Sequence, residues 1–297
     1  MSSPGRSTSA SDGVAGFYSP APLETPVARI MGAGLSGLDS ADDLERVEQA
    51  RMIHSGELMS VHSWELVTAV DGPGTRMTTF LSGCPLRCLY CHNPDTLDMR
   101  RGTMIPTEEL MERMLRYKRI FDRTGGGITM SGGEPLMQPA GIARIFEFAK
   151  ENGIHTALDT TGFLGWRCTD EMLSNLDLCL LDIKSGTEKT YRALTSRELQ
   201  PTIEFAKRLS DAEVSVWVRF VLVPGHTDSA DNIREVAEIA STITSLERLE
   251  VLPFHQMGRD KWHALGLPYL LDEVEPPTPG ETEAARDIFR EMGIPTF

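Results

Sequence analysis

Beyond residue 75 the sequence alternates between short apolar runs and amphipathic stretches, and this alternation constrains the fold more than any other feature. The apolar runs occupy residues 76–83, 126–135, 154–162, 176–184, 214–225 and 246–255. Stretches with helical spacing separate or follow them, at 106–122, 140–153, 169–176, 198–212, 229–243 and 281–293. Several runs are apolar throughout, which is typical of parallel strands buried on both faces. Strands that alternate with helices imply β–α–β units.

About six such units are present, fewer than the eight of a closed (β/α)8 barrel. An open, partial (β/α)6-type barrel with parallel strands and a doubly wound sheet both fit the pattern. In either fold, ligands bind at the carboxyl ends of the strands. We therefore expect the chemically distinctive residues that end or follow the runs to share one mouth. These are Cys84, Gly132, Asp159, Thr160, Asp182, Lys184, Arg219 and His255.

Residues 1–56 differ in composition from the rest of the chain. Ser, Gly, Pro and Ala dominate, and the only helical pattern lies at 41–55. We predict a poorly ordered extension over 1–56, with a partner-docking arm as the alternative, and a catalytic domain over 57–297. Residues 60–70 fit a hairpin or an edge strand.

The charge balance limits the partners. The chain carries 43 acidic against 29 basic side chains, a formal net charge of −14, which argues against nucleic acid and anionic lipid as partners. No apolar run is long enough to span a membrane, and the N-terminus does not resemble a signal peptide. We therefore expect a cytoplasmic protein. In that compartment clustered cysteines more often bind metal or do chemistry than form disulfides.

Three of the five cysteines lie within eight residues, in the stretch CPLRCLYC. Thiolates at this spacing suit zinc or an iron–sulfur cluster. A structural zinc site needs four ligands, and His92 directly follows Cys91, so both side chains would have to turn onto one ion. A [4Fe–4S] cluster held by Cys84, Cys88 and Cys91 would instead leave one iron open to bind a substrate. Cys168 and Cys179 are isolated and are expected to be small core residues.

The C-x3-C-x2-C pattern, with Tyr90 before the third cysteine, resembles the radical S-adenosylmethionine superfamily. From about residue 60 to the end, the chain resembles the pyruvate formate-lyase activating enzymes in particular. The stretches that carry this resemblance are TAVDGPGTRMTTFLSGCPLRCLYCHNPDT, GGGITMSGGEP, GIHTALDTTGF, LLDIK, VWVRFVLVPG and LPFHQMG, in the same order along the chain.

The resemblance implies an oxidoreductase of anaerobic glucose metabolism that uses a [4Fe–4S] cluster and S-adenosyl-L-methionine. Reductive cleavage of that cofactor would give a 5′-deoxyadenosyl radical, which abstracts a hydrogen from a glycine of pyruvate formate-lyase. Flavodoxin or ferredoxin would supply the electron, and the enzyme is expected to act as a monomer. The protein's part in such chemistry is orientation and exclusion of solvent.

The resemblance also implies roles for individual residues. The GGEP turn at Gly132, Gly133 and Glu134 would lie against the methionine amine of the cofactor, because a glycine backbone can approach a ligand closely. Tyr90 and His92 would line the adenosine end.

Further roles are assigned to residues at later strand ends. Asp182, Ile183 and Lys184 would contact the cofactor, with Lys184 near its carboxylate, and His255 would join them. Arg219 is a candidate partner for an acidic group of the cofactor or of the peptide. Asp71, in the turn DGPG, is a candidate on the side of the substrate glycine.

A monovalent cation is a further possibility suggested by the same relatives. Asp159, Thr160 and Asp182 offer hard oxygen ligands at neighbouring strand ends. The alternative for these three residues is ordinary hydrogen bonding at the strand ends.

Three alternative functions compete with this interpretation. One is an activase of another glycyl radical enzyme, although several such activases carry a cysteine-rich ferredoxin-like insertion, and residues 100–107 here contain no cysteine. The second is a radical S-adenosylmethionine enzyme that acts on a small molecule. The third, from a different class, is a non-catalytic zinc-binding module.

Overall fold

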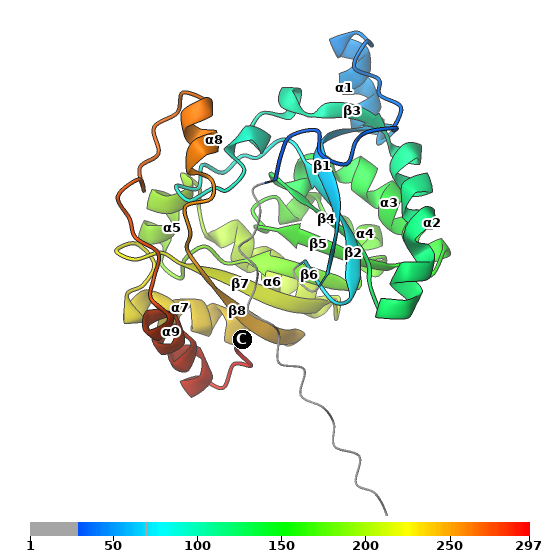
Figure 1. Cartoon of the computed structure of the whole chain (residues 1–297). Helices are drawn as coiled ribbons and strands as arrows, with labels where there is room; N and C mark the ends of the chain where they lie inside the picture. Colours follow the sequence, from blue (N-terminus) through cyan, green and yellow to red (C-terminus); the bar gives the residue numbers. More distant parts are fainter. Residues whose placement is uncertain (1–28, 69–70) are drawn as a thin grey trace, which may run out of the picture.

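The computed structural model describes residues 29–68 and 71–297, and Figure 1 shows one curved sheet with helices around its outside. The sheet has eight strands in the order β3-β1-β2-β4-β5-β6-β7-β8. Their bounds are β1 Leu58–Thr68, β2 Thr75–Leu81, β3 Thr103–Pro106, β4 Gly127–Gly132, β5 His155–Thr160, β6 Leu178–Asp182, β7 Ser215–Leu222 and β8 Leu246–Pro253.

The six strands β2, β4, β5, β6, β7 and β8 run parallel, and β1 is antiparallel to both β2 and β3. The sheet is open, with β3 at one edge and β8 at the other. This confirms the predicted partial barrel of six parallel strands. The stretch expected to be a hairpin or an edge strand is β1, but β3 covers its outer side, so it is not the edge.

Helices connect the parallel strands. The longer ones are α2 Thr107–Thr124, α3 Pro139–Glu151, α6 Gln200–Asp211, α7 Ala230–Ser241 and α9 Pro279–Glu291. The shorter ones are α4 Asp170–Ser174, α5 Glu188–Thr195 and α8 Arg259–Ala264, with single 3-10 turns η1 Pro94–Thr96, η2 Met99–Arg101, η3 Pro135–Met137 and η4 Gly165–Arg167. Apolar residues at helical spacing, such as Ile142, Ile145 and Phe146 of α3, join the main core.

Part of the segment predicted to be disordered is folded in the structure. Residues 46–55 form helix α1, Arg46–Ser55, and Leu35 joins the core with 9% of its surface exposed. Two backbone hydrogen bonds fix the segment, from Gly32 N to His62 O (2.7 Å) and from Ala41 N to Met104 O (2.8 Å). The prediction of disorder was therefore wrong for residues 29–56. Residues 1–28 lie outside the described part, and a domain boundary at residue 57 stays a prediction.

Across the described ranges, no helix combines the length and the apolar character that a membrane crossing requires.

Candidate active site

The three clustered cysteines lie on the loop that leaves the carboxyl end of β2. Three other parts of the fold hold this loop in place. Gly83 N donates to Thr96 O of η1 (2.6 Å), and the amides of Arg87 and Leu89 donate to the last carbonyls of α5 at 2.8 and 3.0 Å. The indole of Trp262 in α8 donates to Cys91 O at 2.9 Å. The loop is therefore ordered by contacts far away in the sequence.

All three thiols are free of disulfides. Burial raises the pKa of each thiol, in Cys88 to about 12 and in Cys84 well above its usual value. Because metals bind the thiolate, iron has to displace a proton from each sulfur. Among the described residues, no three His, Cys, Asp or Glu side chains form a group that could hold a single metal ion.

The glycine turn after β4 packs directly against the cysteine loop. Gly132 has φ +123°, and a Cβ there would lie 2.1 Å from Leu81 N. A Cβ on Gly133 would lie 2.4 Å from Gly83 O and 3.2 Å from the Cβ of Cys84. Any side chain at either glycine would therefore push the turn away from the first cysteine.

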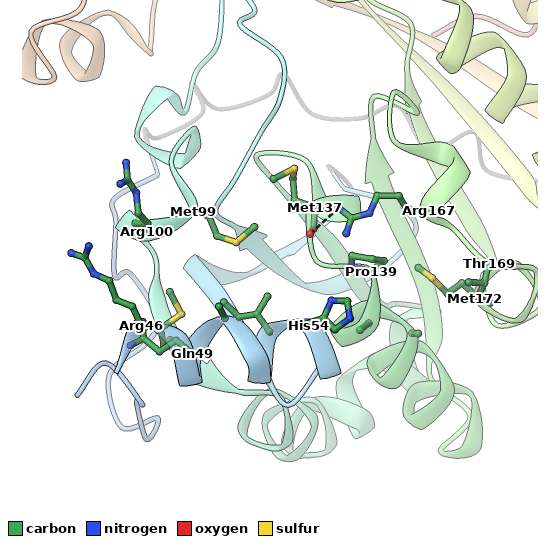
Figure 2. A pocket seen from close by; sticks show the side chains of 15 residues that line it. Arg46, Gln49, His54, Met99, Arg100, Met137, Pro139, Arg167, Thr169 and Met172 are labelled. Carbon is green, nitrogen blue, oxygen red and sulfur yellow. Dashed lines mark hydrogen bonds between the residues drawn. The ribbon is translucent and has the colours of Figure 1, made fainter. Parts of the chain in front are cut away.

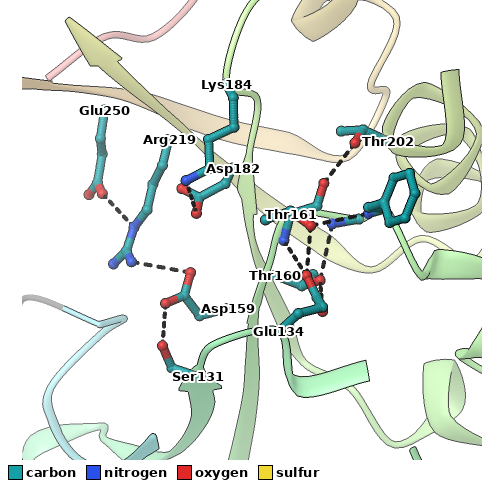
Figure 3. A network of polar contacts seen from close by, with 12 residues as sticks. Ser131, Glu134, Asp159, Thr160, Thr161, Asp182, Lys184, Thr202, Arg219 and Glu250 are labelled. Carbon is teal, nitrogen blue, oxygen red and sulfur yellow. Dashed lines mark hydrogen bonds and ion pairs between the residues drawn. The ribbon is translucent and has the colours of Figure 1, made fainter. Parts of the chain in front are cut away.

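Glu134 is bound by protein donors (Figure 3), and its predicted contact with the cofactor stays a prediction. Its carboxylate accepts from Thr160 Oγ1 (2.6 Å), from Thr161 N and Oγ1 (3.0 and 2.6 Å) and from Leu136 N (3.1 Å). Burial raises the pKa of Glu134 although these four donors favour its charged form. We conclude that this side chain fixes the glycine turn to the end of β5.

Lys184 lies between Asp182 and Tyr90. Its Nζ is 2.7 Å from Asp182 Oδ2 and 5.6 Å from the centre of the Tyr90 ring. Burial alone would lower the pKa of Lys184, but the nearby Asp182 carboxylate raises it well above its usual value. Ile183, the residue between Asp182 and Lys184 in the sequence, is fully buried in the main core. Its amide donates to Arg219 O (3.0 Å).

His92 and His255 meet at the same mouth. Their rings stack with centroids 3.9 Å apart, and burial lowers the pKa of His92 to about 3, so this ring is neutral. The Oη of Tyr90 and the Nε2 of His92 are buried and have no hydrogen-bond partner among the described residues. Since buried polar atoms are nearly always hydrogen-bonded, these two indicate room for a polar ligand.

Arg219 of β7 is surrounded by three carboxylates, of which Figure 3 shows Asp159 and Glu250. Its guanidinium lies 3.6 Å from Asp71 Oδ1, 3.4 Å from Asp159 Oδ1 and 3.4 Å from Glu250 Oε2. Burial would lower the pKa of Arg219, but the three acids raise it. Burial raises the pKa of Asp159 to about 6 despite the nearby arginine, and the charges of Asp182 and Asp71 add to this effect.

Arg29 was missed by the sequence analysis because it lies in the segment expected to be disordered. Its guanidinium is 2.8 Å from Glu65 Oε1, 3.4 Å from Asp71 Oδ2 and 3.9 Å from the centre of the Phe80 ring. The segment that follows residue 28 thus places a cation beside Asp71, the residue predicted for the substrate side.

The predicted cation ligands do not all face one another. Ser131 Oγ donates to Asp159 Oδ2 (2.6 Å), whereas the Thr160 hydroxyl donates to Glu134. Successive residues of a strand point to opposite faces, which separates the two side chains. The hydroxyl of Thr160 is therefore committed elsewhere, and a cation site at Asp159 and Asp182 stays a prediction.

Comparison with known families defines the class. The Radical SAM superfamily matches residues 78–238, more than half of the chain, so this is a radical SAM protein. Enzymes of that superfamily use a [4Fe–4S] cluster and S-adenosyl-L-methionine.

The most informative relatives are named for one activity. The pyruvate formate-lyase-activating enzyme of Clostridium pasteurianum is 45% identical over 215 residues, covering 72% of this chain and 90% of the relative. The pyruvate formate-lyase 1-activating enzyme of Escherichia coli (strain K12) is 40% identical over 235 residues, covering 78% and 96%. The chain belongs to the family of pyruvate formate-lyase-activating enzymes, as its sequence stretches indicated.

A solved structure supports the fold alone. A radical SAM methyltransferase from Sphaerobacter thermophilus matches with a TM-score of 0.55 at 17% identity, covering 86% of this chain and 81% of that one.

The residues present fit the [4Fe–4S] cluster and S-adenosyl-L-methionine that the family uses. Three free thiols lie on one ordered loop, the glycine turn touches the first of them, and two buried polar atoms at the mouth lack a protein partner. The zinc-module alternative is overturned by the family match.

Proposed function

We propose that this chain activates pyruvate formate-lyase by generating a radical on one of its glycines. The observation that carries the proposal is the identity of 40–45% over at least 90% of the length of relatives named for this activity. The cluster and S-adenosyl-L-methionine, when bound, supply the reductive bond cleavage that yields the hydrogen-abstracting radical.

The protein's own residues hold and orient these groups. Cys84, Cys88 and Cys91 would hold the cluster, and the turn at Gly132 and Gly133 would offer backbone polar groups to the methionine amine of S-adenosyl-L-methionine. Because a side chain at either glycine would clash with β2 or its loop, the turn can keep this position only with glycine.

The remaining side chains of the mouth differ in charge, and each charge suits a different part of the ligands. Lys184 keeps its proton and provides a fixed cation for a carboxylate, while neutral His92 and Tyr90 offer polar atoms in a dry environment. Asp71 and Arg219 form the substrate side, where Arg219 neutralises buried carboxylates and could accept a peptide's acidic group in exchange.

The same proposal includes the protein partners, the oligomeric state and the cellular compartment. The protein substrate is the glycine-bearing loop of pyruvate formate-lyase, the electron donor is a flavodoxin or a ferredoxin, and the enzyme works as a cytoplasmic monomer. The net charge of −14 supports a soluble setting without nucleic acid.

The test is anaerobic incubation of the iron–sulfur-loaded protein with S-adenosyl-L-methionine, a chemical reductant and the host's pyruvate formate-lyase. We expect electron paramagnetic resonance to show a carbon-centred glycyl signal, lost when the lyase glycine is replaced by alanine. Cofactor cleavage without that signal would contradict the activase assignment. It would then favour another glycyl radical enzyme or a small molecule as the substrate.

Cys88→Ala tests the ligand assignment. With two thiols left, we expect iron content and reductive cofactor cleavage to fall to background, at least about 100-fold below the unmodified protein. Cys168→Ala is the control, because this buried cysteine of the main core lies outside the loop and should leave both readouts unchanged. Retained cleavage in the Cys88 variant would refute the assignment.

A further inference from the structure

Two adjoining cavities lie beside the cysteine loop, away from the residues of the mouth. The first, about 630 Å³, includes Cys84 in its lining. The second, about 740 Å³, lies between α1, α3 and the turns η2 and η3, and Figure 2 shows it from close by. They share Met99, Arg100 and Met137 in their linings, so the two cavities are neighbours, and the first reaches Cys84, the first cluster ligand.

The charge of this surface is opposite to that of the whole chain. Its lining contains five arginines and a single acidic residue, Asp98, in a chain with a net charge of −14. We call these arginines the basic face; they are Arg46, Arg87, Arg100, Arg101 and Arg167. Asp98 pairs with Arg100 at 2.8 Å, which leaves a strong local excess of positive charge.

One arginine of the basic face, Arg87, belongs to the cysteine loop itself. Arg87 donates from Nη1 to the carbonyl of Cys84 at 2.8 Å, so this cation lies against the backbone of a cluster ligand. The floor is apolar, with Met99, Met137 and Leu265 among the lining residues, and Leu267 is 39% exposed. Arginine and methionine around an apolar centre are enriched in protein interfaces.

We propose that the basic face docks an acidic protein that donates one electron to the cluster. The inference rests on the proposed function, because it requires a cluster at Cys84 that must be reduced. One electron leaves the donor's reduced cofactor and enters the cluster, so the donor is oxidised and the cluster reduced by one electron, and no bond or proton changes place. Opposite charges steer such encounters and raise their rate, and interfaces of redox partners are small.

The glycine-bearing loop of the lyase is the weaker occupant for this surface. Its predicted contacts, Asp71 and Arg219, line neither cavity. An electron donor needs proximity to a cluster ligand, whereas the peptide needs access to the mouth between the strands. The two partners would therefore use separate surfaces.

The test is a double charge reversal, Arg46→Glu with Arg101→Glu. Both side chains are exposed, and neither has an ion pair or a side-chain hydrogen bond within residues 29–68 and 71–297. Arg87 and Arg167 are kept, because each donates to a backbone carbonyl. The matched control is Arg116→Glu with Arg119→Glu, two exposed arginines of α2 that line neither cavity and give the same net charge.

Binding of oxidised host flavodoxin to the cluster-loaded protein is measured by quenching of flavin fluorescence, without lyase. We expect Kd to rise roughly 10- to 100-fold at low salt in the Arg46/Arg101 variant, and the difference to shrink near about 0.5 M salt. The control pair should change Kd by less than about threefold. Equal Kd values for both variants would overturn the proposal.

The second readout is the rate of cluster reduction, followed by absorbance. Reduced flavodoxin should reduce the Arg46/Arg101 variant more slowly by a similar factor, whereas dithionite should reduce all proteins at the same rate. Slow reduction of the Arg46/Arg101 variant by dithionite too would also overturn it. Because no step uses the lyase, a missing glycyl signal would count against the proposed function alone.

Discussion

Glu134 sits in the turn that was expected to contact the cofactor, yet four protein donors surround its carboxylate. Replacing it by Gln turns one acceptor oxygen into an N–H2 group that faces donors. We expect Glu134→Gln to lower the free energy of unfolding by about 2–4 kcal/mol, because buried donors lose their acceptor. Urea unfolding under anaerobic conditions, followed by circular dichroism, measures this.

The matched control for this prediction is Glu171→Gln, on an exposed glutamate of α4. It should shift the unfolding free energy by less than about 0.5 kcal/mol. If the two variants had the same free energy of unfolding, Glu134 would not stabilise the position of the glycine turn. A loss of S-adenosyl-L-methionine binding without loss of stability would support the predicted direct contact of this residue with the cofactor.

Single residues were predictable where spacing alone decides their direction. Asp182 and Lys184 were expected at one mouth, and since alternate residues of a strand lie on one face, their side chains meet at 2.7 Å. The partners of Thr160 were not predictable, because they depend on how the turn after β4 folds back over β5. Arg29 was missed for a similar reason, since nothing local marks it as a partner of Asp71.

At the scale of elements, β5 carries a titratable group at its first residue. His155 is partly buried and its Nδ1 has no hydrogen-bond partner within the described part of the chain. Burial lowers its pKa below the ordinary 6.5, and the charge of Arg76 adds to this. A lowered histidine pKa means that the folded state favours the neutral ring. The folded protein therefore keeps its full stability above about pH 6.5, the ordinary pKa, and loses stability as the pH falls toward the folded-state pKa of this ring.

We therefore expect His155→Gln to reduce the loss of stability between about pH 7 and 5 relative to the unmodified protein. Urea unfolding at several pH values measures the slope. His54→Gln, on an exposed histidine of α1, is the control and should keep the original slope. An unchanged slope in the His155 variant would show that this ring does not contribute to acid sensitivity.

The elements that were predicted correctly are those with strong periodicity. The six parallel strands and the long helices α2, α3, α6 and α7 follow the apolar pattern closely. The elements β3, α5 and α8 were not predicted from the sequence, because their four to eight residues are too few for a clear period. Yet α5 and α8 supply carbonyls and an indole to the cysteine loop, so short elements without a sequence signal help to order the site.

For the whole molecule, the unexpected feature is that residues 29–56 are folded and form hydrogen bonds to the edge strand β3. The composition of this segment predicts disorder, since it has few large apolar residues. Its anchors are long-range: Met104 N of β3 donates to Asp42 Oδ1 at 2.9 Å, and Thr107 Oγ1 donates to Gly56 O at 2.6 Å. Such bonds depend on the position of β3 and α2, so no local pattern could reveal them.

A pair of truncations tests whether this segment belongs to the folded unit. We expect a chain that starts at residue 57 to be less stable than one that starts at residue 29 by at least about 2–4 kcal/mol, because loss of Leu35 leaves a cavity in the main core and β3 loses its bonds to the segment. The measurement is urea unfolding of both cluster-loaded proteins, with Leu35→Ala in the full chain to isolate the packing contribution. Equal unfolding midpoints for the two truncations would mean that the segment merely rests on the sheet, and the catalytic unit would then begin near residue 57 as its composition suggested. A lower midpoint for the shorter chain, with Leu35→Ala accounting for only part of the loss, would assign the rest to the backbone bonds that tie the segment to the edge strand.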